Sequence, residues 1–148
     1  MSKRILVPMD GAPLSEKALE VALSENDDAE FTVLHVIDPA DPGYSYPIDV
    51  DVTREPLHGS EAWYERAEEL ADDLFEDAQE TAADYDVELE TELVAGTPAR
   101  VIVDYAADND IDHIIMGSHG RDEESRILLG SVTETVAFRS PVHVTLVR

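Results

Sequence analysis

The sequence has 148 residues, 43% of them hydrophobic, which is enough apolar material for the core of one domain and excludes a disordered chain. Asp and Glu number 34 against 10 Lys and Arg, so the formal net charge is −24. A surface this acidic repels the phosphates of nucleic acids and of anionic membranes, and neither is expected as a partner. The absence of cysteine excludes disulfides, thiolate catalysis and thiolate metal sites.

The acidity also predicts something about the surroundings of the protein. Carboxylates repel one another at low ionic strength, whereas about 1 M salt shortens the screening length to about 3 Å and removes most of that repulsion. Only two lysines occur, Lys3 and Lys17. We therefore predict a halophilic protein adapted to a salt-rich cytoplasm, with an ordinary solvated acidic surface as the alternative. No apolar run is long enough for a bilayer span or a signal-peptide core, so a cytoplasmic location is expected.

Hydrophobic periodicity predicts strands alternating with helices. In chain order the pattern predicts a strand at Arg4–Asp10, a helix at Ser15–Ser24, a strand at Phe31–Ile37, a helix at Glu61–Tyr85, an edge strand at Val87–Ala95, a helix at Pro98–Asp108, a strand at Asp112–Gly117, a helix at Val132–Arg139 and a last strand at Val142–Val147. Ser60 and Thr97 are expected as N-caps, and Trp63 as a core residue. Asp38–Ser60, with four prolines, is a long connection.

Alternating strands and helices predict an α/β fold of three layers, in which helices cover both faces of a five-stranded parallel sheet. No internal repeat or second composition appears, so residues 1–148 are expected to form one domain. In the common strand order 3-2-1-4-5 the winding reverses between the first and fourth strands, and ligands of such sheets bind beyond the carboxyl ends of the strands at that point. Those two strands end at Pro8-Met9-Asp10 and at Met116-Gly117.

The segment after the fourth strand carries the residues typical of an anion site. Gly117 and Gly120 would let the backbone approach a ligand closely, and Gly130-Ser131-Val132-Thr133 begins a helix whose free N–H groups favour anions. The hydroxyls of Ser131 and Thr133 would add donors. The alternative is a tight strand exit followed by an ordinary N-cap at Ser131. Neither a Walker A lysine nor a nucleophile elbow is present.

These residues match a known motif. Gly117, Gly120, Gly130 and Ser131 fit G-x2-G-x9-G-[ST], and together with Ile5–Gly11, Val94–Pro98 and Pro141–Val147 they make the whole chain resemble the universal stress protein family. The resemblance implies an adenine nucleotide alpha-hydrolase-like fold and the ATP-binding branch, because members that do not bind ATP lack these glycines. It also implies a homodimer in which Val142–Val147 pairs with its twin, and an unpaired apolar edge strand agrees with that.

The resemblance further implies where ATP would lie. Pro8, Met9 and Asp10 would contact the adenosine, the backbone of Val36 would read the adenine edge, Met116 and Gly117 would border sugar and base, and Gly120, Gly130, Ser131 and Val132 would hold the phosphates beside His119. We add Thr133 to this set for its hydroxyl. Mg²⁺ would be bridged by the phosphates rather than held by a protein site. For Asp10 the alternative is an acid that caps the turn at Gly11.

Three functions compete. The first is a stress-response protein, not an enzyme, for which ATP is a ligand or switch, because no general base or nucleophile is evident. The second is a slow ATP-hydrolysing enzyme that uses Asp10 and a divalent cation. The third is a dimeric interaction module that needs no nucleotide. Of the histidines, His35, His58, His113 and His143 are expected in structural or surface roles, and the spacing of His113 and His119 is not typical of zinc.

Overall fold

The computed structural model describes residues 2–40, 59–118 and 130–148. Its elements in chain order are β1 (Arg4–Pro8), α1 (Pro13–Glu25), β2 (Glu30–Ile37), α3 (Glu61–Ala83), β3 (Glu90–Ala95), α4 (Pro98–Asp108), β4 (His113–Gly117), α5 (Ser131–Arg139) and β5 (His143–Val147). Every strand pair is parallel, and the strand order is β3-β2-β1-β4-β5. The predicted fold class and strand order are confirmed.

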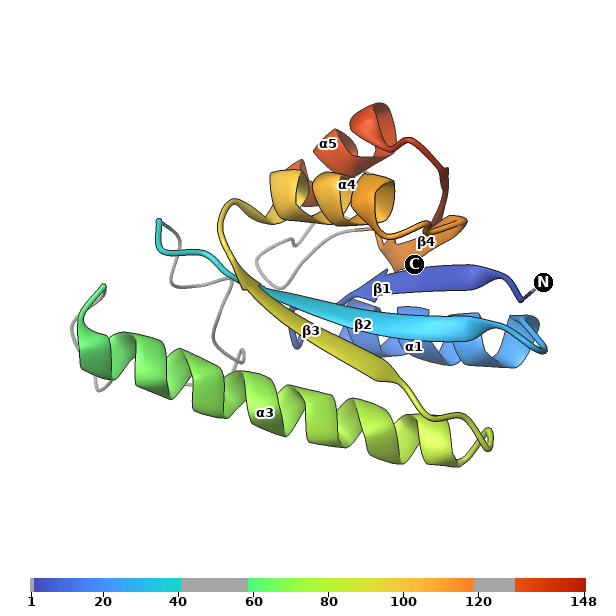
Figure 1. Ribbon diagram of the computed structural model, residues 1–148, viewed down its shortest axis with the longest axis horizontal. Coiled ribbons are helices and arrows are strands. Elements are labelled where there is room, and N and C mark those ends of the chain that lie inside the picture. Colours follow the sequence, from blue (N-terminus) through green and yellow to red (C-terminus); the bar gives the residue numbers. More distant parts are fainter. Residues whose placement is uncertain (1, 41–58, 119–129) are drawn as a thin grey trace.

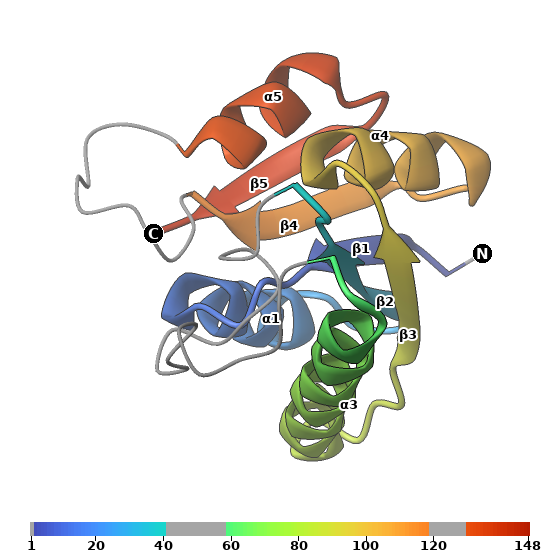
Figure 2. The ribbon, with the colours of Figure 1, turned by 90° about the vertical axis from the view of Figure 1, so that its left-hand side faces the viewer.

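The sheet forms the middle of three layers, with α1 and α3 on one face and α4 and α5 on the other (Figure 1, Figure 2). Side chains alternate along each strand, so Ile5 and Val7 join the core under α1 and α3, while Leu6 joins the core under α4 and α5. All three are fully buried. Burial on both faces is the reason that the central strands read as continuous apolar runs.

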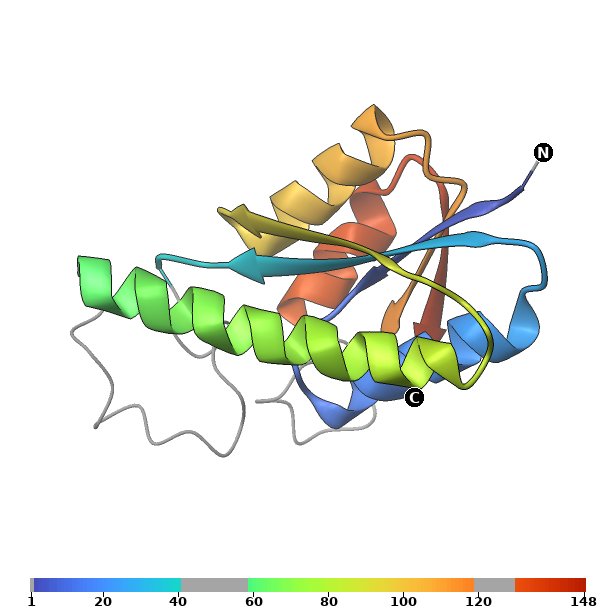
Figure 3. The ribbon, with the colours of Figure 1, turned by 60° about the horizontal axis from the view of Figure 1, so that its bottom comes forward.

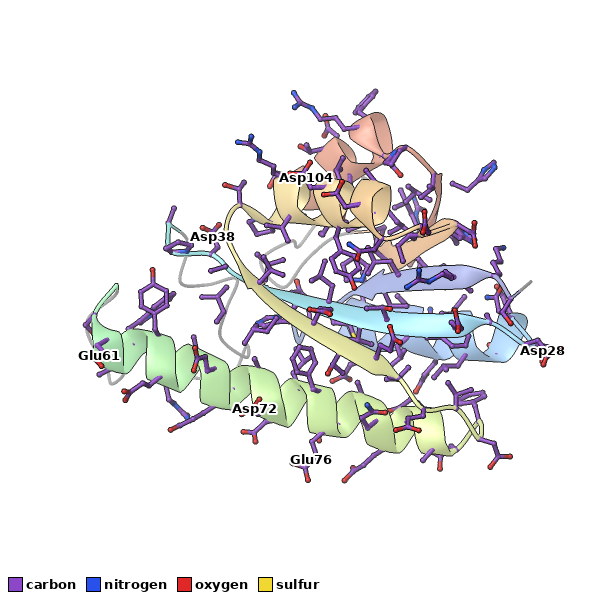
Figure 4. The ribbon with its side chains drawn as sticks, viewed as in Figure 1. Asp28, Asp38, Glu61, Asp72, Glu76 and Asp104 are labelled. Carbon is purple, nitrogen blue, oxygen red and sulfur yellow. The ribbon has the colours of Figure 1, made fainter. Side chains whose placement is uncertain are left out.

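Helix α3 is long and amphipathic, and it runs along the sheet on the side of β2 and β3 (Figure 3). Trp63 is 1% exposed and packs with Ala67 and Leu70. Asp72 and Glu76 extend away from the sheet toward solvent (Figure 4). The predicted N-cap is confirmed, because the Ser60 hydroxyl accepts a hydrogen bond from the backbone N–H of Trp63 at 3.1 Å.

The predicted edge strand Val87–Ala95 begins three residues late, at Glu90. The side chain of Gln79 in α3 occupies both backbone groups of Leu89: its Oε1 accepts from the Leu89 N–H at 3.0 Å and its Nε2 donates to the Leu89 carbonyl at 2.9 Å. The Gln79 amide thus replaces β2 as the hydrogen-bonding partner of this residue. Pairing with β2 starts at Glu90, opposite Thr32.

Two helix starts differ from the prediction, and one predicted N-cap lacks its hydrogen bond. Helix α1 begins at Pro13, not Ser15, with proline in the first turn, where its missing N–H costs nothing. Thr97 occupies the N-cap position of α4, but its side chain makes no capping hydrogen bond. Helix α5 begins at Ser131, one residue before the predicted Val132. Its N-cap is Gly130, with φ −66° and ψ 155°, and not Ser131, which was the N-cap in the alternative to an anion site.

Most of the predicted connection Asp38–Ser60, with His58, lies outside the described residues. In the ranges that the structure describes, no helix combines the length and the apolar character needed to cross a bilayer.

Candidate functional site

The candidate site lies at the carboxyl ends of β1 and β4, which are neighbours in the sheet. From β1 the chain moves through β2 to β3 on one side, and β4 and β5 lie on the other, so the winding reverses between β1 and β4. Figure 2 shows both strands ending at the same edge, beside the start of α5. The topology therefore brings together Pro8–Asp10, Met116–Gly117 and Gly130–Thr133, as predicted.

The end of β1 is held from β2 by two hydrogen bonds. The Met9 N–H donates to the Leu34 carbonyl at 2.9 Å, and Nδ1 of His35 lies 2.7 Å from the Met9 carbonyl oxygen. Because a carbonyl only accepts, His35 carries its proton on Nδ1 in this contact. His35 is 2% exposed, which agrees with the predicted structural role. The sequence did not predict its contact with Met9; it showed only a histidine within an apolar strand.

Asp10 follows directly and starts the turn into α1. Its Oδ1 accepts a hydrogen bond from the Ala12 N–H at 2.9 Å, and Ala12 is the N-cap of α1. Gly11 has φ +85°, the left-handed region that glycine adopts without strain. Asp10 thus has the turn-capping contact that was the alternative to a ligand contact, and this bond also sets the orientation of its carboxylate at the edge of the site.

Val36 presents backbone groups toward the site. The Leu34 carbonyl points toward β1, where it accepts from Met9, and the Ile37 carbonyl points toward β3, where it accepts from Gly96 at 2.9 Å. Backbone groups alternate in direction along a strand, so those of Val36 point to the side of β1. The last β1–β2 pair is Pro8 with Leu34, and Val36 therefore lies past the end of β1. Its side chain is 1% exposed, in the core under α4 and α5.

The end of β4 is packed tightly against α1. A Cβ placed on Gly117 would lie 2.9 Å from the Cβ of Leu14 and 3.2 Å from its carbonyl carbon, so an alanine at position 117 requires α1 to shift. The missing side chain of Gly117 is accounted for by this packing, a reason that the motif alone did not reveal. Met116, the residue before it, is 5% exposed and lies in the core under α4 and α5.

Two hydrogen bonds join the start of α5 to the exit of β4, and a third joins that exit to the end of β5. The Thr133 hydroxyl donates to the Gly117 carbonyl at 3.0 Å, and the Gly130 N–H donates to the Ser118 carbonyl at 3.2 Å. The Ser118 N–H in turn donates to the Val147 carbonyl at 2.8 Å. Ser118, 3% exposed, was absent from the predicted site residues. The first N–H groups of α5, which have no acceptor within the helix, begin at this junction.

A groove of about 660 Å³ reaches the candidate site from the side of β1. Met9, Asp10 and Gly11 line one end, and the rest is lined mainly by α1 and α3, whose carboxylates, Glu16 and Asp77 among them, alternate with apolar side chains such as Leu74. The pKa of Glu16 is raised, first by burial and then by the charges of Asp77 and Glu20. Phosphates would meet repulsion in this groove, whereas the start of α5 lies outside its lining.

No metal centre is evident in residues 2–40, 59–118 and 130–148, where no three His, Asp or Glu side chains are placed to hold an ion. His113 lies on β4 in register with His143 on β5, and its Nε2 is 2.7 Å from the Thr145 hydroxyl. His143 is exposed. The predicted site residues His119 and Gly120 and the acidic spacer after them lie outside the described residues.

The comparisons with known proteins agree with this architecture. The universal stress protein family model matches residues 1–148, and the chain belongs to that family. Universal stress protein MJ0531 of Methanocaldococcus jannaschii is 31% identical over 149 residues, which cover 99% of this chain and 82% of the relative. Universal stress protein MJ0577 of the same organism is 34% identical over 157 residues, 100% of this chain and 96% of the relative.

Solved structures show the same fold. The structure of MJ0577 matches with a TM-score of 0.80 at 32% identity, covering 99% of this chain and 96% of that chain. A universal stress protein in complex with cAMP matches at 21% identity and TM-score 0.67, covering 99% and 97%. One from Archaeoglobus fulgidus in complex with dAMP matches at 18% and 0.66, covering 100% and 98%. The fold is adenine nucleotide alpha-hydrolase-like, as predicted.

Proposed function

We propose that this universal stress protein binds ATP at the carboxyl ends of β1 and β4, and that the nucleotide acts as a ligand or switch in a stress response rather than as a substrate. Residues 1–148 act as one domain in this proposal, and the cytoplasm, which supplies ATP, is the proposed location. The observation that carries it is the first turn of α5, bonded to the end of β4 where the winding of the sheet reverses.

The residues at the site fit the parts of the nucleotide. The N–H groups at the start of α5 suit phosphates, since they combine free donors with the positive end of the helix dipole. The backbone of Val36, past the end of β1, suits the edge of an adenine. The cAMP and dAMP complexes of related proteins support an adenine nucleotide as the ligand class. Mg²⁺ enters this proposal bridged by phosphates.

The proposed site residues keep the set implied by the family, with one change of role. They are Pro8, Met9, Asp10, Val36, Met116, Gly117, His119, Gly120, Gly130, Ser131, Val132 and Thr133. In this set the hydroxyl of Thr133 is engaged by Gly117 and is not a phosphate donor.

Calorimetric titration with ATP and Mg²⁺ in about 2 M KCl tests the proposal, because salt at that level screens the acidic surface. Gly130→Asp places a carboxylate at the N-cap of α5, where φ −66° suits any residue and Asp is itself a good cap. We expect saturable binding by the wild type and none by this variant. Gly130→Asn is the matched control: it has the same shape and capping ability without the charge, and should retain more affinity than Gly130→Asp. A folded wild type that binds no ATP would contradict the proposal.

We further propose a homodimer formed through Val142–Val147. Strand β5 is an edge of the sheet, and edge strands pair readily with a second chain. From Thr135 to Arg148 the sequence has no Asp or Glu. Phe138, in the last turn of α5, is 82% exposed. An apolar, acid-free edge on a chain of net charge −24 supports contact with a second copy, because two such surfaces approach without carboxylate repulsion.

The acidic surface also predicts how the stability of the protein depends on salt. We infer that the free energy of unfolding rises as KCl increases from about 0.1 M to about 2 M, because the screening length falls from about 10 Å to below about 3 Å. Urea denaturation at fixed pH across this range measures the effect. Stability that is unchanged by KCl would indicate that the acids are merely solvated.

A further inference from the structure

Thr133 is the third residue of α5, and its side chain faces inward. It is 3% exposed, and its hydroxyl donates to the Gly117 carbonyl at 3.0 Å. A threonine hydroxyl has one proton to donate. While this bond exists, the hydroxyl cannot donate to a phosphate, and its burial keeps it from solvent. The Thr133 hydroxyl here attaches α5 to the end of β4.

A second hydrogen bond, one turn earlier in the chain, also attaches α5 to the exit of β4. The Gly130 N–H donates to the Ser118 carbonyl at 3.2 Å. Bonds at Gly130 and Thr133 reach adjacent residues of the β4 exit, so together they set both the position of the first turn of α5 and its rotation about the helix axis. Gly117, which accepts the Thr133 bond, is itself held by its close contact with Leu14 of α1.

Between these two points lie Ser131 and Val132, whose N–H groups belong to the free first turn. Ser131 is exposed and Val132 is half-buried. Hydrogen bonds weaken steeply with distance and misalignment, so a turn that shifts or rotates loses contact with an anion even though its N–H groups remain present. The rigidity of the first turn therefore matters for the ligand as much as for the helix.

We propose that Thr133 is a positioning residue for nucleotide phosphates: its hydroxyl bond to Gly117 aims the N–H groups of Ser131 and Val132 at the phosphates. This inference rests on the proposed binding of ATP. It predicts that loss of the hydroxyl weakens binding of the phosphates and leaves binding of the adenosine part unchanged, because Met9, Asp10 and Val36 do not depend on this bond.

The experiment measures dissociation constants of ATP and of adenosine for each variant. Thr133→Val replaces the hydroxyl by a methyl group of similar size, and we expect ATP to bind about fivefold or more weakly while adenosine stays within about twofold. Thr133→Ser keeps the hydroxyl and should retain ATP affinity within about twofold. Thr135→Val is the control in the same helix, because the Thr135 hydroxyl donates to the Ser131 carbonyl of its own helix, at 3.0 Å, and not to β4.

Several outcomes would overturn the inference. Equal ATP affinity in Thr133→Val and wild type would show that the hydroxyl does not position the phosphates. Equal losses for ATP and adenosine would show a general structural effect instead of a phosphate-specific one. If Thr133→Val does not fold, Thr133→Ala removes the same hydroxyl with less bulk and is judged by the same ratio of affinities. A wild type that binds neither ligand would remove the nucleotide site itself, which is a different result from binding that ignores Thr133.

Discussion

The two edge strands of the sheet have opposite chemistry. At β3, Glu90 and Glu92 are exposed along the strand and Glu88 precedes it, so charge protects this edge from pairing with another chain. At β5, the segment Thr135–Arg148 has no acidic side chain, although Asp and Glu make up 34 of the 148 residues. One edge is thus protected by carboxylates and the other lacks them.

The large hydrophobic residues that are exposed also differ in whether acidic residues surround them. Among the residues that the structure describes they are Phe138, 82% exposed in the last turn of α5 before β5, and Tyr85, 41% exposed in the turn before β3. Tyr85 lies among acids, since Asp84 and Asp86 flank it. An acidic protein gains solubility from each surface carboxylate, so their absence around an exposed phenylalanine favours an interface over an accident of composition.

The largest effect that we expect tests this comparison directly. Phe138→Asp should raise the dissociation constant of the proposed dimer at least about tenfold, because a buried aromatic anchor would be replaced by a charge. The free energy of unfolding should change little, since Phe138 is 82% exposed. Sedimentation velocity over a range of concentrations measures the dimer. Tyr85→Asp is the matched control and should not alter association. A wild type that is monomeric throughout, or equal effects of the two substitutions, would refute the difference between the edges.

The second prediction concerns pH at the β5 side. Burial, followed by the charges of Lys3 and His143, lowers the pKa of His113 from its ordinary value of 6.5. The buried Nδ1 of His113 also has no hydrogen-bond partner among the described residues. The folded state therefore binds fewer protons than the unfolded state as the pH falls below about 6.5, and the stability present above that pH is lost.

The loss should stay below about 1 kcal/mol, because His113 is partly exposed and its charge is screened by solvent. Denaturant unfolding of the wild type and of His113→Gln between about pH 8 and about pH 5 measures it. We expect the wild type to lose stability relative to the variant as the pH falls. Parallel pH profiles of the two proteins would contradict this account of His113.

The third prediction concerns the turn that leads into β3. Asp86 has φ +58°, a left-handed conformation that costs most residues energy and that glycine adopts freely. The turn also follows the negative end of the α3 dipole, where a carboxylate is unfavourable. Asp86→Gly should raise the free energy of unfolding by about 0.5 kcal/mol, measured by urea denaturation. Asp84→Gly is the control: Asp84 has φ −66°, so the same substitution should give no gain. A gain at Asp84 alone would disprove the conformational argument.

The smallest effect concerns the acid-rich groove between α1 and α3. Because the pKa of Glu16 is raised in the folded state, ionising it costs stability as the pH rises above about 4.5. Glu16→Gln should therefore stabilise the protein at neutral pH by a few tenths of a kcal/mol, given the exposure of the side chain. The gain should vanish below the ordinary pKa, and it should shrink in about 1 M KCl, which screens the charges of Asp77 and Glu20 but leaves the effect of burial.

Asp104→Asn is the comparison for Glu16→Gln. Asp104 lies on α4, 3.9 Å from the Arg100 guanidinium, so its carboxylate has an attractive partner. Figure 4 shows it on the opposite side of the sheet from α3. Thermal unfolding in low salt should show no gain for Asp104→Asn. A gain of equal size for both variants would mean that net charge alone, and not the groove, sets the effect.

Much of the fold could be predicted from local patterns. The apolar runs of β1, β2 and β4 identify strands buried on both faces, and the spacing of Trp63, Ala67 and Leu70 identifies the inner face of α3. Ser60 precedes that pattern and caps the helix as its chemistry predicts. Such features depend on neighbours in the sequence or on burial itself, so local sequence patterns are enough to predict them. The motif glycines likewise located the candidate site through a resemblance to a family.

The remaining features depended on residues far apart in the sequence. Gly117 lacks a side chain because Leu14 occupies that space, and the Thr133 hydroxyl bonds to Gly117 rather than facing a ligand. The Gln79 side chain delays β3 until Glu90, and His35 fixes the end of β1 through Met9. Hydrophobic periodicity predicts which side of a helix or strand is buried, but it does not predict which residues pack against that side. The sequence alone determined the elements and indicated the edge of the sheet where a ligand would bind. Tertiary packing decided the partner of each polar group, because it sets the distances on which a hydrogen bond depends.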